Sequence, residues 1–449
     1  MRTVPSRSLL AISTLLASTV LVTSPASASA WTAVAPVPVA NGVAVNTATH
    51  RFYGLENGTT TTAGAVAVCA PTALSGVTKT LTVGFNPFGI AVNSRTNTIY
   101  VLNYGPTATP STTVTVISGA TNAVTATISG LPSSASAIAV NPTTNRIYVT
   151  GGAGASATAP GSLSVINGAT NTFVTLGVGY NPEGVAVNTV TNRVYVSNAG
   201  ISTAGPSLSV FNGSTNALVA NLTTPSSAAP AGLAVDSAAN RVYVASSLGL
   251  IVFNGATNAF VTTVAVGASL SSVTVDHAAN LVLVNSSSLK NIYSLHINTL
   301  SIGASLVGPA QASAFSSGLA VDPSLGRVFD ANGAGGTVSV YVESQYLTPQ
   351  APSAPLLTPG AQALTVTWVA PKNLGPAISY YDVLVSTSAA GPFAMPTSSL
   401  GSCYKNVTAP TTTCTIGGLT TGTTYFVEVQ AANTAGFSPA SPYASATSN

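Results

Sequence analysis

Apolar and polar residues alternate over short stretches along most of this chain. One stretch contains four such segments in a row, "GVAVN" (184–188), "RVYVSN" (193–198), "SLSVFNG" (207–213) and "ALVANL" (217–222). Alternation with a period of two predicts β-strands. The connections "NTVTN" and "NGSTN" carry Asn and Gly, which tolerate the positive φ of hairpin turns. Since no long stretch has a 3.6-residue apolar period, we expect an all-β protein.

This pattern of four strands repeats along the chain. Aligned on the strand that ends in Asn or Asp, seven copies end at Asn46, Asn93, Asn141, Asn188, Asp236, Asp276 and Asp322, between 40 and 48 residues apart. Such spacing is typical of the blades of a β-propeller. The seventh copy lacks a fourth strand, whereas "WTAVAPVPV" (31–39) precedes the first copy without a partner. We therefore expect a seven-bladed β-propeller over residues 31–345, closed by the N-terminal strand, which would remove two exposed edges.

The second strand of the repeat also suggests a family. "YVLN", "YVTG" and "YVSN", together with "INGATNT" (166–172), resemble the YVTN-type β-propeller repeats of secreted and surface-layer proteins. The resemblance covers residues 31–345. It implies a propeller fold and specifies no activity.

A different pattern follows a proline-rich linker over residues 346–360. The segments "LTVTW", "YYDVLVS" and "TTYFVEVQAANTAGFSPAS" within residues 361–449 resemble a fibronectin type III domain, a β-sandwich. The resemblance implies that Trp368 is buried and that Tyr425, which follows Leu419, is the corner tyrosine. The integrin-binding RGD triplet of some members is replaced by "NTAGFS".

The first thirty residues have the features of a secretory signal peptide. Arg2 and Arg7 precede an apolar run from Leu9 to Val22, and "ASA" (28–30) is a suitable cleavage site. The run is too short for a membrane span. We therefore expect a protein that is secreted, either extracellular or associated with the cell wall.

The three cysteines fit an exported protein. Cys403 and Cys414 lie in the second domain, where an oxidising compartment favours a disulfide bond between them. Cys69 is then left without a partner. Its place in the apolar strand "AVAVC" favours a buried thiol over an exposed, reactive one.

Charged residues make up only 5% of the chain. Without Arg2 and Arg7 the formal charge is about +1, whereas Lys and Arg contacts to phosphate dominate nucleic-acid affinity. We therefore expect no nucleic-acid partner, and no membrane insertion. The sequence does not specify an oligomeric state, and we expect a monomer.

The sequence offers few candidates for catalysis or metal binding. His50 and His277 fall in turns of different copies, and His296 in a strand, so a shared metal site is not expected. The repeat places Asp236, Asp276 and Asp322 where other copies have Asn, which predicts turn capping. Asp236 and Asp322 can also pair with Arg241 and Arg327 across the hairpin. Asp330, inside a strand, has no such explanation. We expect no catalytic residue, no metal and no cofactor.

The loops differ in how much they vary between copies. Turns between strands one and two, and three and four, are short and uniform, whereas the other connections vary, as in "NAGISTAGPS" and "GGAGASATAPGS". Binding residues concentrate on variable loops of a rigid scaffold, although loop length can also drift without function. The candidate ligand-binding residues on this face are Phe88, Tyr104, Tyr180, Glu183 and Asn198.

Aromatic, amide and hydroxyl groups on the loop face suit an extracellular glycan or a protein surface better than a charged ligand. We therefore expect a secreted, non-catalytic binding or adhesion scaffold that recognises extracellular or cell-wall polymers or surface proteins. The alternative is a secreted carbohydrate-active enzyme, glycosidase- or lyase-like, or an accessory protein in polysaccharide degradation. A packing role in a surface layer is a third interpretation.

Overall fold

The structure is a computed structural model of the 449-residue chain. It describes residues 31–37, 42–56, 58, 62–70, 77–106, 111–152, 159–267, 269–286, 291–307, 318–332, 337–343, 349–373 and 375–449. The expected signal peptide and part of the expected linker lie outside these residues. The described residues form β-strands joined by turns and loops, so the all-β prediction is confirmed.

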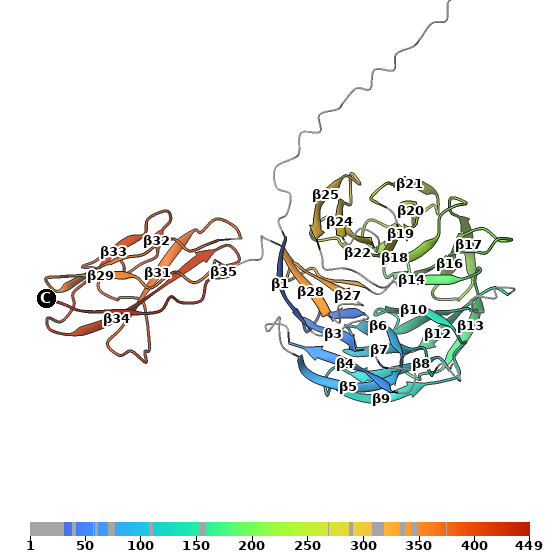
Figure 1. Ribbon diagram of the computed structural model, residues 1–449, viewed down its shortest axis with the longest axis horizontal. Coiled ribbons are helices and arrows are strands. Elements are labelled where there is room, and N and C mark those ends of the chain that lie inside the picture. Colours follow the sequence, from blue (N-terminus) through green and yellow to red (C-terminus); the bar gives the residue numbers. More distant parts are fainter. Residues whose placement is uncertain are drawn as a thin grey trace, which may run out of the picture.

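The described part of residues 31–343 forms seven antiparallel sheets of four strands each (Figure 1). The first sheet comprises β2 (Val43–Asn46), β3 (Arg51–Glu56), β4 (Ala63–Cys69) and β5 (Val77–Phe85). The second comprises β6 (Pro87–Asn93), β7 (Thr98–Asn103), β8 (Thr113–Ser118) and β9 (Ala123–Ile128). The third comprises β10 (Ala135–Asn141), β11 (Arg146–Gly151), β12 (Ser162–Asn167) and β13 (Phe173–Gly177).

The next three sheets repeat this order. The fourth sheet comprises β14 (Pro182–Asn188), β15 (Arg193–Asn198), β16 (Ser207–Asn212) and β17 (Leu218–Thr223). The fifth comprises β18 (Pro230–Asp236), β19 (Arg241–Ser246), β20 (Gly249–Asn254) and β21 (Phe260–Val264). The sixth comprises β22 (Leu270–Asp276), β23 (Leu281–Ser286), β24 (Asn291–His296) and β25 (Ile302–Val307).

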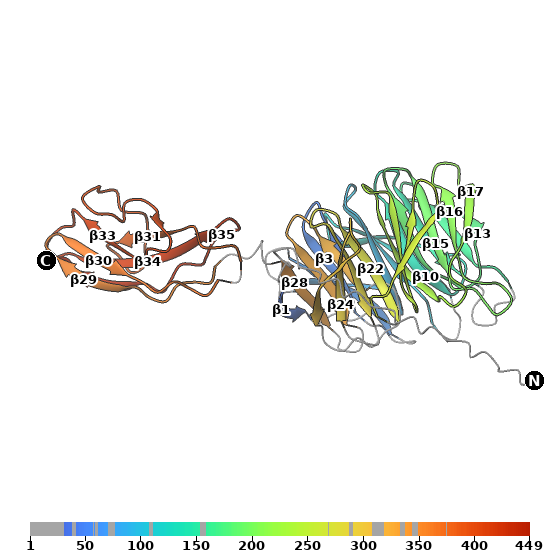
Figure 2. The same cartoon turned by 90° about the horizontal axis from the view of Figure 1, so that it is seen from above.

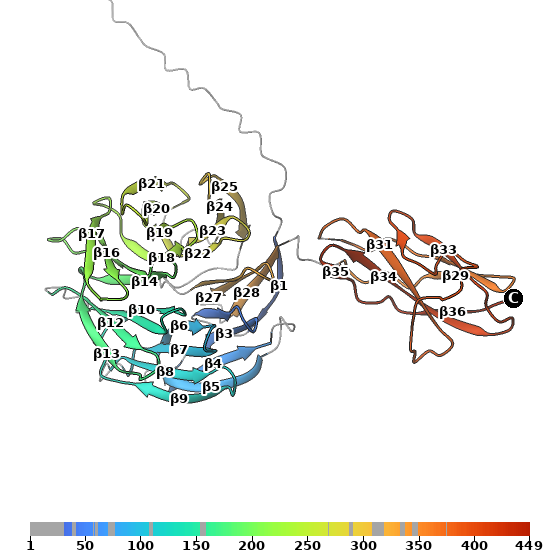
Figure 3. The same cartoon turned by 180° about the vertical axis from the view of Figure 1, so that it is seen from behind.

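The seventh sheet joins the two ends of this part of the chain. Its strands are β26 (Leu319–Asp322), β27 (Arg327–Asn332), β28 (Thr337–Glu343) and β1 (Trp31–Val37). Strand β1 pairs antiparallel with β28, from Trp31 opposite Glu343 to Val37 opposite Val338, and Figure 3 shows the two side by side. The predicted pairing of the N-terminal strand as the fourth strand of the last sheet is confirmed.

The predicted fold class nevertheless needs a correction. The sheets are separate, and among the described residues no sheet is closed or curled into a barrel or a propeller. The ladders of backbone hydrogen bonds end at the first and fourth strand of each sheet. Neighbouring sheets meet mainly through side chains, with isolated bonds to the backbone such as that from the Gly105 N–H to the Phe85 carbonyl. The predicted seven-bladed β-propeller is therefore replaced by a coarser description, an all-β array of seven four-stranded sheets.

The first strands bring neighbouring sheets together. Each of these strands contacts the first strand of the next sheet in sequence order, and β26 contacts β2. A cavity of about 170 Å³ lies among them, and all seven strands contribute to its lining, mostly with glycine and apolar residues. Leu319, Val273 and Ser136 are among the residues that line it.

The repeated "VYV" of the second strands forms the core between sheets. In β15, Val194 and Val196 pack against residues of the third sheet, whereas Tyr195 packs against residues of the fifth. All three are at most 1% exposed. A strand that is buried on both faces needs a continuous apolar run, which explains why this phrase recurs.

Asparagine side chains join the turns of successive sheets. Asn188 is fully buried, and its Oδ1 accepts hydrogen bonds from the backbone N–H groups of Val190 and Thr191, at 3.0 and 2.9 Å. Its Nδ2 donates to Oδ1 of Asn240 in the next sheet at 2.8 Å. Equivalent amide bonds join Asn46 to Asn97, Asn93 to Asn145 and Asn141 to Asn192.

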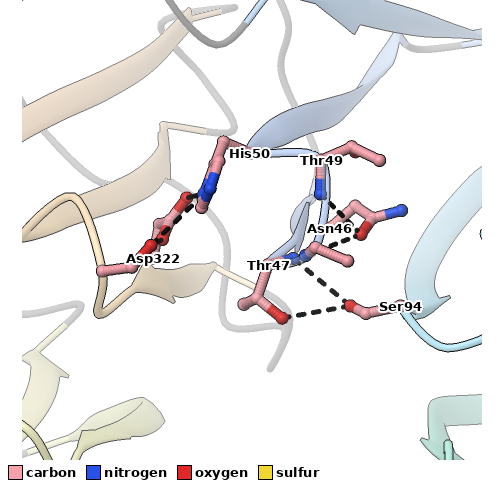
Figure 4. A network of polar contacts seen from close by, with 8 residues as sticks. Asn46, Thr47, Thr49, His50, Ser94 and Asp322 are labelled. Carbon is pink, nitrogen blue, oxygen red and sulfur yellow. Dashed lines mark hydrogen bonds and ion pairs between the residues drawn. The ribbon is translucent and has the colours of Figure 1, made fainter.

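In the last three sheets an aspartate replaces the asparagine that ends the first strand, namely Asp236, Asp276 and Asp322. Oδ2 of Asp322 lies 2.9 Å from Nδ1 of His50 in the first sheet, as Figure 4 shows. Oδ2 of Asp236 lies 3.0 Å from Nδ1 of His277 in the sixth sheet. The predicted pairing of Asp236 with Arg241 is therefore wrong, because Nη1 of Arg241 donates to the Ile297 carbonyl instead. The predicted capping is confirmed for Asp236, which accepts from the N–H groups of Ala238 and Ala239.

The C-terminal part is a β-sandwich of two sheets (Figures 1 and 2). One sheet contains β29 (Leu356–Gly360), β30 (Ala363–Thr367) and β33 (Thr413–Gly417). The other contains β31 (Tyr380–Ser386), β32 (Val407–Thr408), β34 (Thr424–Asn433), β35 (Gly436–Phe437) and β36 (Ala444–Thr447). Trp368 is buried with its ring centroid 5.2 Å from that of Tyr381, and the hydroxyl oxygen of Tyr425 accepts from the Thr420 N–H. Both residues thus lie as the sequence predicts.

Candidate functional site

The five predicted ligand-binding residues belong to two different sheets. Phe88 is the second residue of β6 and Tyr104 directly follows β7 in the second sheet, with ring centroids 6.2 Å apart. Phe88 is half-buried and packs against the core between the second and third sheets. Tyr180, Glu183 and Asn198 belong to the fourth sheet and its entry loop. The structure therefore does not bring all five into one site.

An asparagine shapes the loop that enters each of these two sheets. Asn86 has a positive φ of 49°, and its Nδ2 donates to the Gly105 carbonyl at 3.0 Å. Asn181 has the same φ, and its Nδ2 donates to the Gly200 carbonyl at 2.9 Å. Sequence reasoning missed both asparagines, although the dipeptide "NP" marks each of them. These bonds hold the entry loop against the end of the second strand, and thereby position Tyr180.

Asn198 is fully buried and therefore does not present its side chain to a ligand. Its Nδ2 lies 3.2 Å from Oγ of Ser207 and 3.0 Å from Oγ of Ser209. Oγ of Ser209 in turn donates to Oδ1 of Asn221 at 3.2 Å. Asn198 thus acts as a positioning residue, because it fixes the serine that orients the exposed amide of Asn221.

A cleft of about 580 Å³ lies where this network reaches the surface. Its wall contains Tyr180 and Ser209, with residues from the outer strand β17 and the segment that follows it. No charged side chain lines it among the described residues. Tyr180 is the only residue of its wall that sequence reasoning predicted; the residues missed include Leu218, Asn221, Thr223, Thr224 and Ser226.

The cleft combines an apolar surface with neutral hydrogen-bonding groups. Leu218 is 56% exposed, and Tyr180 supplies a half-buried ring. Thr224 is buried, and its hydroxyl has no hydrogen-bond partner in the described part of the protein. An unsatisfied buried hydroxyl is costly, so a ligand or water that bonds to it gains free energy. Asn221 was identifiable in the sequence as an amide within the otherwise apolar and hydroxylic strand "LVANLT".

Glu183 has a different environment from the cleft residues. It is the second residue of β14, it is half-buried, and burial raises the pKa of its carboxyl group above the ordinary value of 4.5. It is not part of the cleft wall. Glu183 therefore remains a candidate ligand-binding residue only for a ligand that lies near the start of β14, outside the cleft.

The three cysteines lie where the sequence predicts two bonded residues and one buried thiol. Cys403 and Cys414 form the predicted disulfide bond. Cys69 is buried, as predicted, and burial together with the charge of Glu56 raises the pKa of its thiol to about 12. In the described ranges no three His, Cys, Asp or Glu side chains are grouped as a metal site. No helix of that part of the chain is long and apolar enough to span a membrane.

Comparisons with known proteins place the two parts of the chain differently. Residues 350–447 match the model of the fibronectin type III domain, so the C-terminal part is such a domain. No curated protein matches the chain. Among solved structures, hydrazine synthase of Kuenenia stuttgartiensis is similar, with a TM-score of 0.56 and 12% identity over 68% of this chain and 95% of that chain. At this identity the likeness shows the fold alone. The resemblance of residues 31–345 to YVTN-type repeats stays a prediction.

The fibronectin type III domain indicates a binding or scaffold role for the protein. The domain does not specify what is bound. The nature of the ligand has to be argued from the cleft in the fourth sheet.

Proposed function

We propose that this protein is a secreted, non-catalytic binding scaffold that holds a neutral extracellular or cell-wall glycan in the cleft of the fourth sheet. The observation that carries the proposal is the lining of that cleft. It combines a tyrosine, an exposed leucine, an oriented amide and several hydroxyls, and no charged side chain among the described residues. The predicted signal peptide, which is untested, supports the secreted location.

The chemistry of the lining favours a polyhydroxylated ligand. Amides and hydroxyls both donate and accept hydrogen bonds, as sugar hydroxyls do. Oδ1 of Asn221 is engaged by Ser209, which leaves its two N–H donors free for a ligand. Sites that place a few polar groups in a mostly apolar cleft of 300–1,000 Å³ are typical of small-ligand binding. The ring of Tyr180 and the side chain of Leu218 would cover the apolar faces of the sugar.

The proposal can be tested by binding of neutral oligosaccharides to the full chain on a glycan array, followed by calorimetry with the best probe. We expect Tyr180→Ala and Asn221→Ala each to weaken binding at least about tenfold, since each removes a contact worth roughly 1.4 kcal/mol. Tyr104→Ala is the matched control, because it removes a tyrosine from an equivalent loop of another sheet. It should leave binding unchanged.

Two outcomes would contradict this function. One is the absence of binding to any neutral glycan, or binding that is equally affected by all three substitutions. The other is the appearance of cleaved product during the binding assay, which would establish the alternative of a carbohydrate-active enzyme.

A further inference from the structure

Four polar side chains are buried between the sixth and seventh sheets, close to the central cavity. They are Ser272 on β22, Asn285 on β23, Asp330 on β27 and Ser339 on β28, each 0–6% exposed. In five of the other six sheets the residue at the position of Asp330 is valine, for example Val196 and Val244. A buried carboxylate thus replaces a core methyl pair at this one junction, at a cost in free energy unless it is compensated.

The backbone brings these groups to facing surfaces. Ser272 is directly opposite Asn285 in its sheet, and Ser339 is directly opposite Asp330 in the other. Nδ2 of Asn285 donates to Oδ1 of Asp330 at 3.2 Å, across the junction. Gly318 leaves room beside them, because a Cβ there would lie 3.5 Å from Oγ of Ser272 and 3.7 Å from Nδ2 of Asn285.

Two oxygen atoms of this cluster lack a hydrogen-bond partner in the described part of the protein. They are Oγ of Ser272 and Oδ1 of Asn285. The orientation of the Asn285 amide is set by its bond to the Asp330 carboxylate, since the reverse orientation would place two acceptors together. Its Oδ1 is therefore an acceptor without a donor in a buried place, which costs about 1–3 kcal/mol if left so.

We propose that this cluster binds a calcium-like cation between the sixth and seventh sheets. The Asp330 carboxylate, the Asn285 amide oxygen and the hydroxyls of Ser272 and Ser339 are hard oxygen ligands of the kind that Ca²⁺ takes. A bound cation would satisfy the two unpartnered oxygens and offset the buried charge. With one carboxylate the affinity is expected in the range of extracellular modules, a dissociation constant of about 10⁻⁴–10⁻³ M.

The surroundings of the cluster agree with a cation site. Burial and, in second place, the charge of Asp330 raise the pKa of the Tyr341 hydroxyl to about 12, so the Asp330 charge reaches this part of the seventh sheet. Asp330 pairs with Leu319, and Ser272 precedes Val273, and both of these apolar residues line the central cavity.

The experiment is calcium titration of the metal-stripped full chain, read out by calorimetry and thermal unfolding. We expect saturable binding and a rise of Tm with CaCl₂ that NaCl and MgCl₂ of equal ionic strength do not reproduce. Asp330→Asn should weaken calcium binding more than tenfold, because it removes the only carboxylate among the proposed ligands. Ser272→Ala, a smaller change, should weaken binding at least threefold.

The matched control is Asp236→Asn, which neutralises another buried aspartate outside the cluster and should leave calcium binding unchanged. The proposal is overturned if the wild-type protein binds no calcium at about ten times the expected dissociation constant. It is equally overturned if MgCl₂ or NaCl gives the same rise of Tm, or if Ser272→Ala and Asp330→Asn both bind calcium as tightly as the wild type.

Discussion

The junction between the fourth and fifth sheets and the junction between the sixth and seventh have the same backbone plan and different side chains. In the first, Asn188 caps its own turn and donates to Asn240 of the next sheet at 2.8 Å. In the second, Asp276 takes the place of Asn188, and Gly326 takes the place of Asn240. Oδ1 of Asp276 still accepts from the Ala279 N–H, but Oδ2 has no partner in the described part of the chain.

This difference shows which part of the repeat is needed for the turn and which for joining sheets. Capping requires only an acceptor oxygen, which Asp and Asn both supply. Joining requires a donor towards the next sheet, which Asp lacks when it is ionised. Where a histidine supplies the proton instead, as at His50 and His277, the aspartate is tolerated. At Asp276 no such group is present among the described residues, so we infer that this junction is the weaker one.

The largest expected effect is a difference in the free energy of unfolding between two alanine substitutions at equivalent positions of the two junctions. Asn188→Ala removes two capping bonds and the amide bond to Asn240, and leaves the N–H groups of Val190 and Thr191 without their acceptor. We expect it to lower the free energy of unfolding by about 3 kcal/mol. Asp276→Ala loses a capping bond as well, but it also removes a buried carboxylate oxygen without a partner, so its cost should be clearly smaller. Denaturant unfolding of both variants measures the difference, and equal losses would contradict the comparison.

The sequence predicted the repeats and strands well because burial imposes a period. The residues of β15, 193–198, coincide with the predicted strand, since a strand buried on both faces leaves a continuous apolar phrase. The disulfide bond, Trp368 and Tyr425 were also predicted, because local patterns specify them.

The side-chain links between sheets could not be predicted in the same way. The bond from Asn188 to Asn240 spans 52 residues, and the pair of His50 with Asp322 spans 272. Alternation within a strand does not state which neighbouring sheet a side chain reaches. The same limit applies to the site: Asn198 was predicted as a ligand contact, yet its buried amide bonds to serines of the next strand. The arrangement of the sheets, predicted as a closed propeller, likewise depends on contacts of this kind.

A second prediction concerns restoring the side-chain hydrogen bond that the junction between the sixth and seventh sheets lacks. Gly326 has a φ of +54°, within the range of 50–59° of the asparagines at the equivalent turn positions Asn97, Asn145, Asn192, Asn240 and Asn280. Gly326→Asn should therefore be accommodated without backbone strain. Combined with Asp276→Asn it should create the amide bond found at the other junctions and raise the free energy of unfolding by about 1–2 kcal/mol.

Coupling between the two substitutions is the decisive measurement for that prediction. If the gain comes from a new bond, the double variant should exceed the sum of the single ones in a double-mutant cycle. The double variant Asn141→Asp with Asn192→Gly copies the combination of Asp276 and Gly326 at the junction between the third and fourth sheets. Its free energy of unfolding should be lower than that of the wild type. Strict additivity in the first cycle, or no loss in the second, would show that the amide ladder does not join the sheets.

The smallest expected effect is the pH dependence that Asp276 contributes to stability. Burial raises the pKa of its carboxyl group above the ordinary value of 3.8, the charge of Asp322 adds to this, and the Ala279 and Ala278 N–H groups and His277 oppose it. Because the folded-state pKa is the higher one, the folded protein binds more protons than the unfolded chain between the two values. The contribution of Asp276 to stability is therefore fully present below pH 3.8 and is lost as the pH rises through the raised value.

Comparison of wild type with Asp276→Asn isolates this contribution from those of the other carboxylates. The free energy of unfolding of the variant, relative to wild type, should increase as the pH is raised from about 3.8 and then become constant above the raised pKa. Asp236→Asn provides the contrast, because Asp236 has a histidine partner that the neutral amide engages less well. A difference between wild type and Asp276→Asn that stays constant with pH would mean that the carboxylate titrates normally. The junction between the sixth and seventh sheets would then owe its weakness to the missing donor alone.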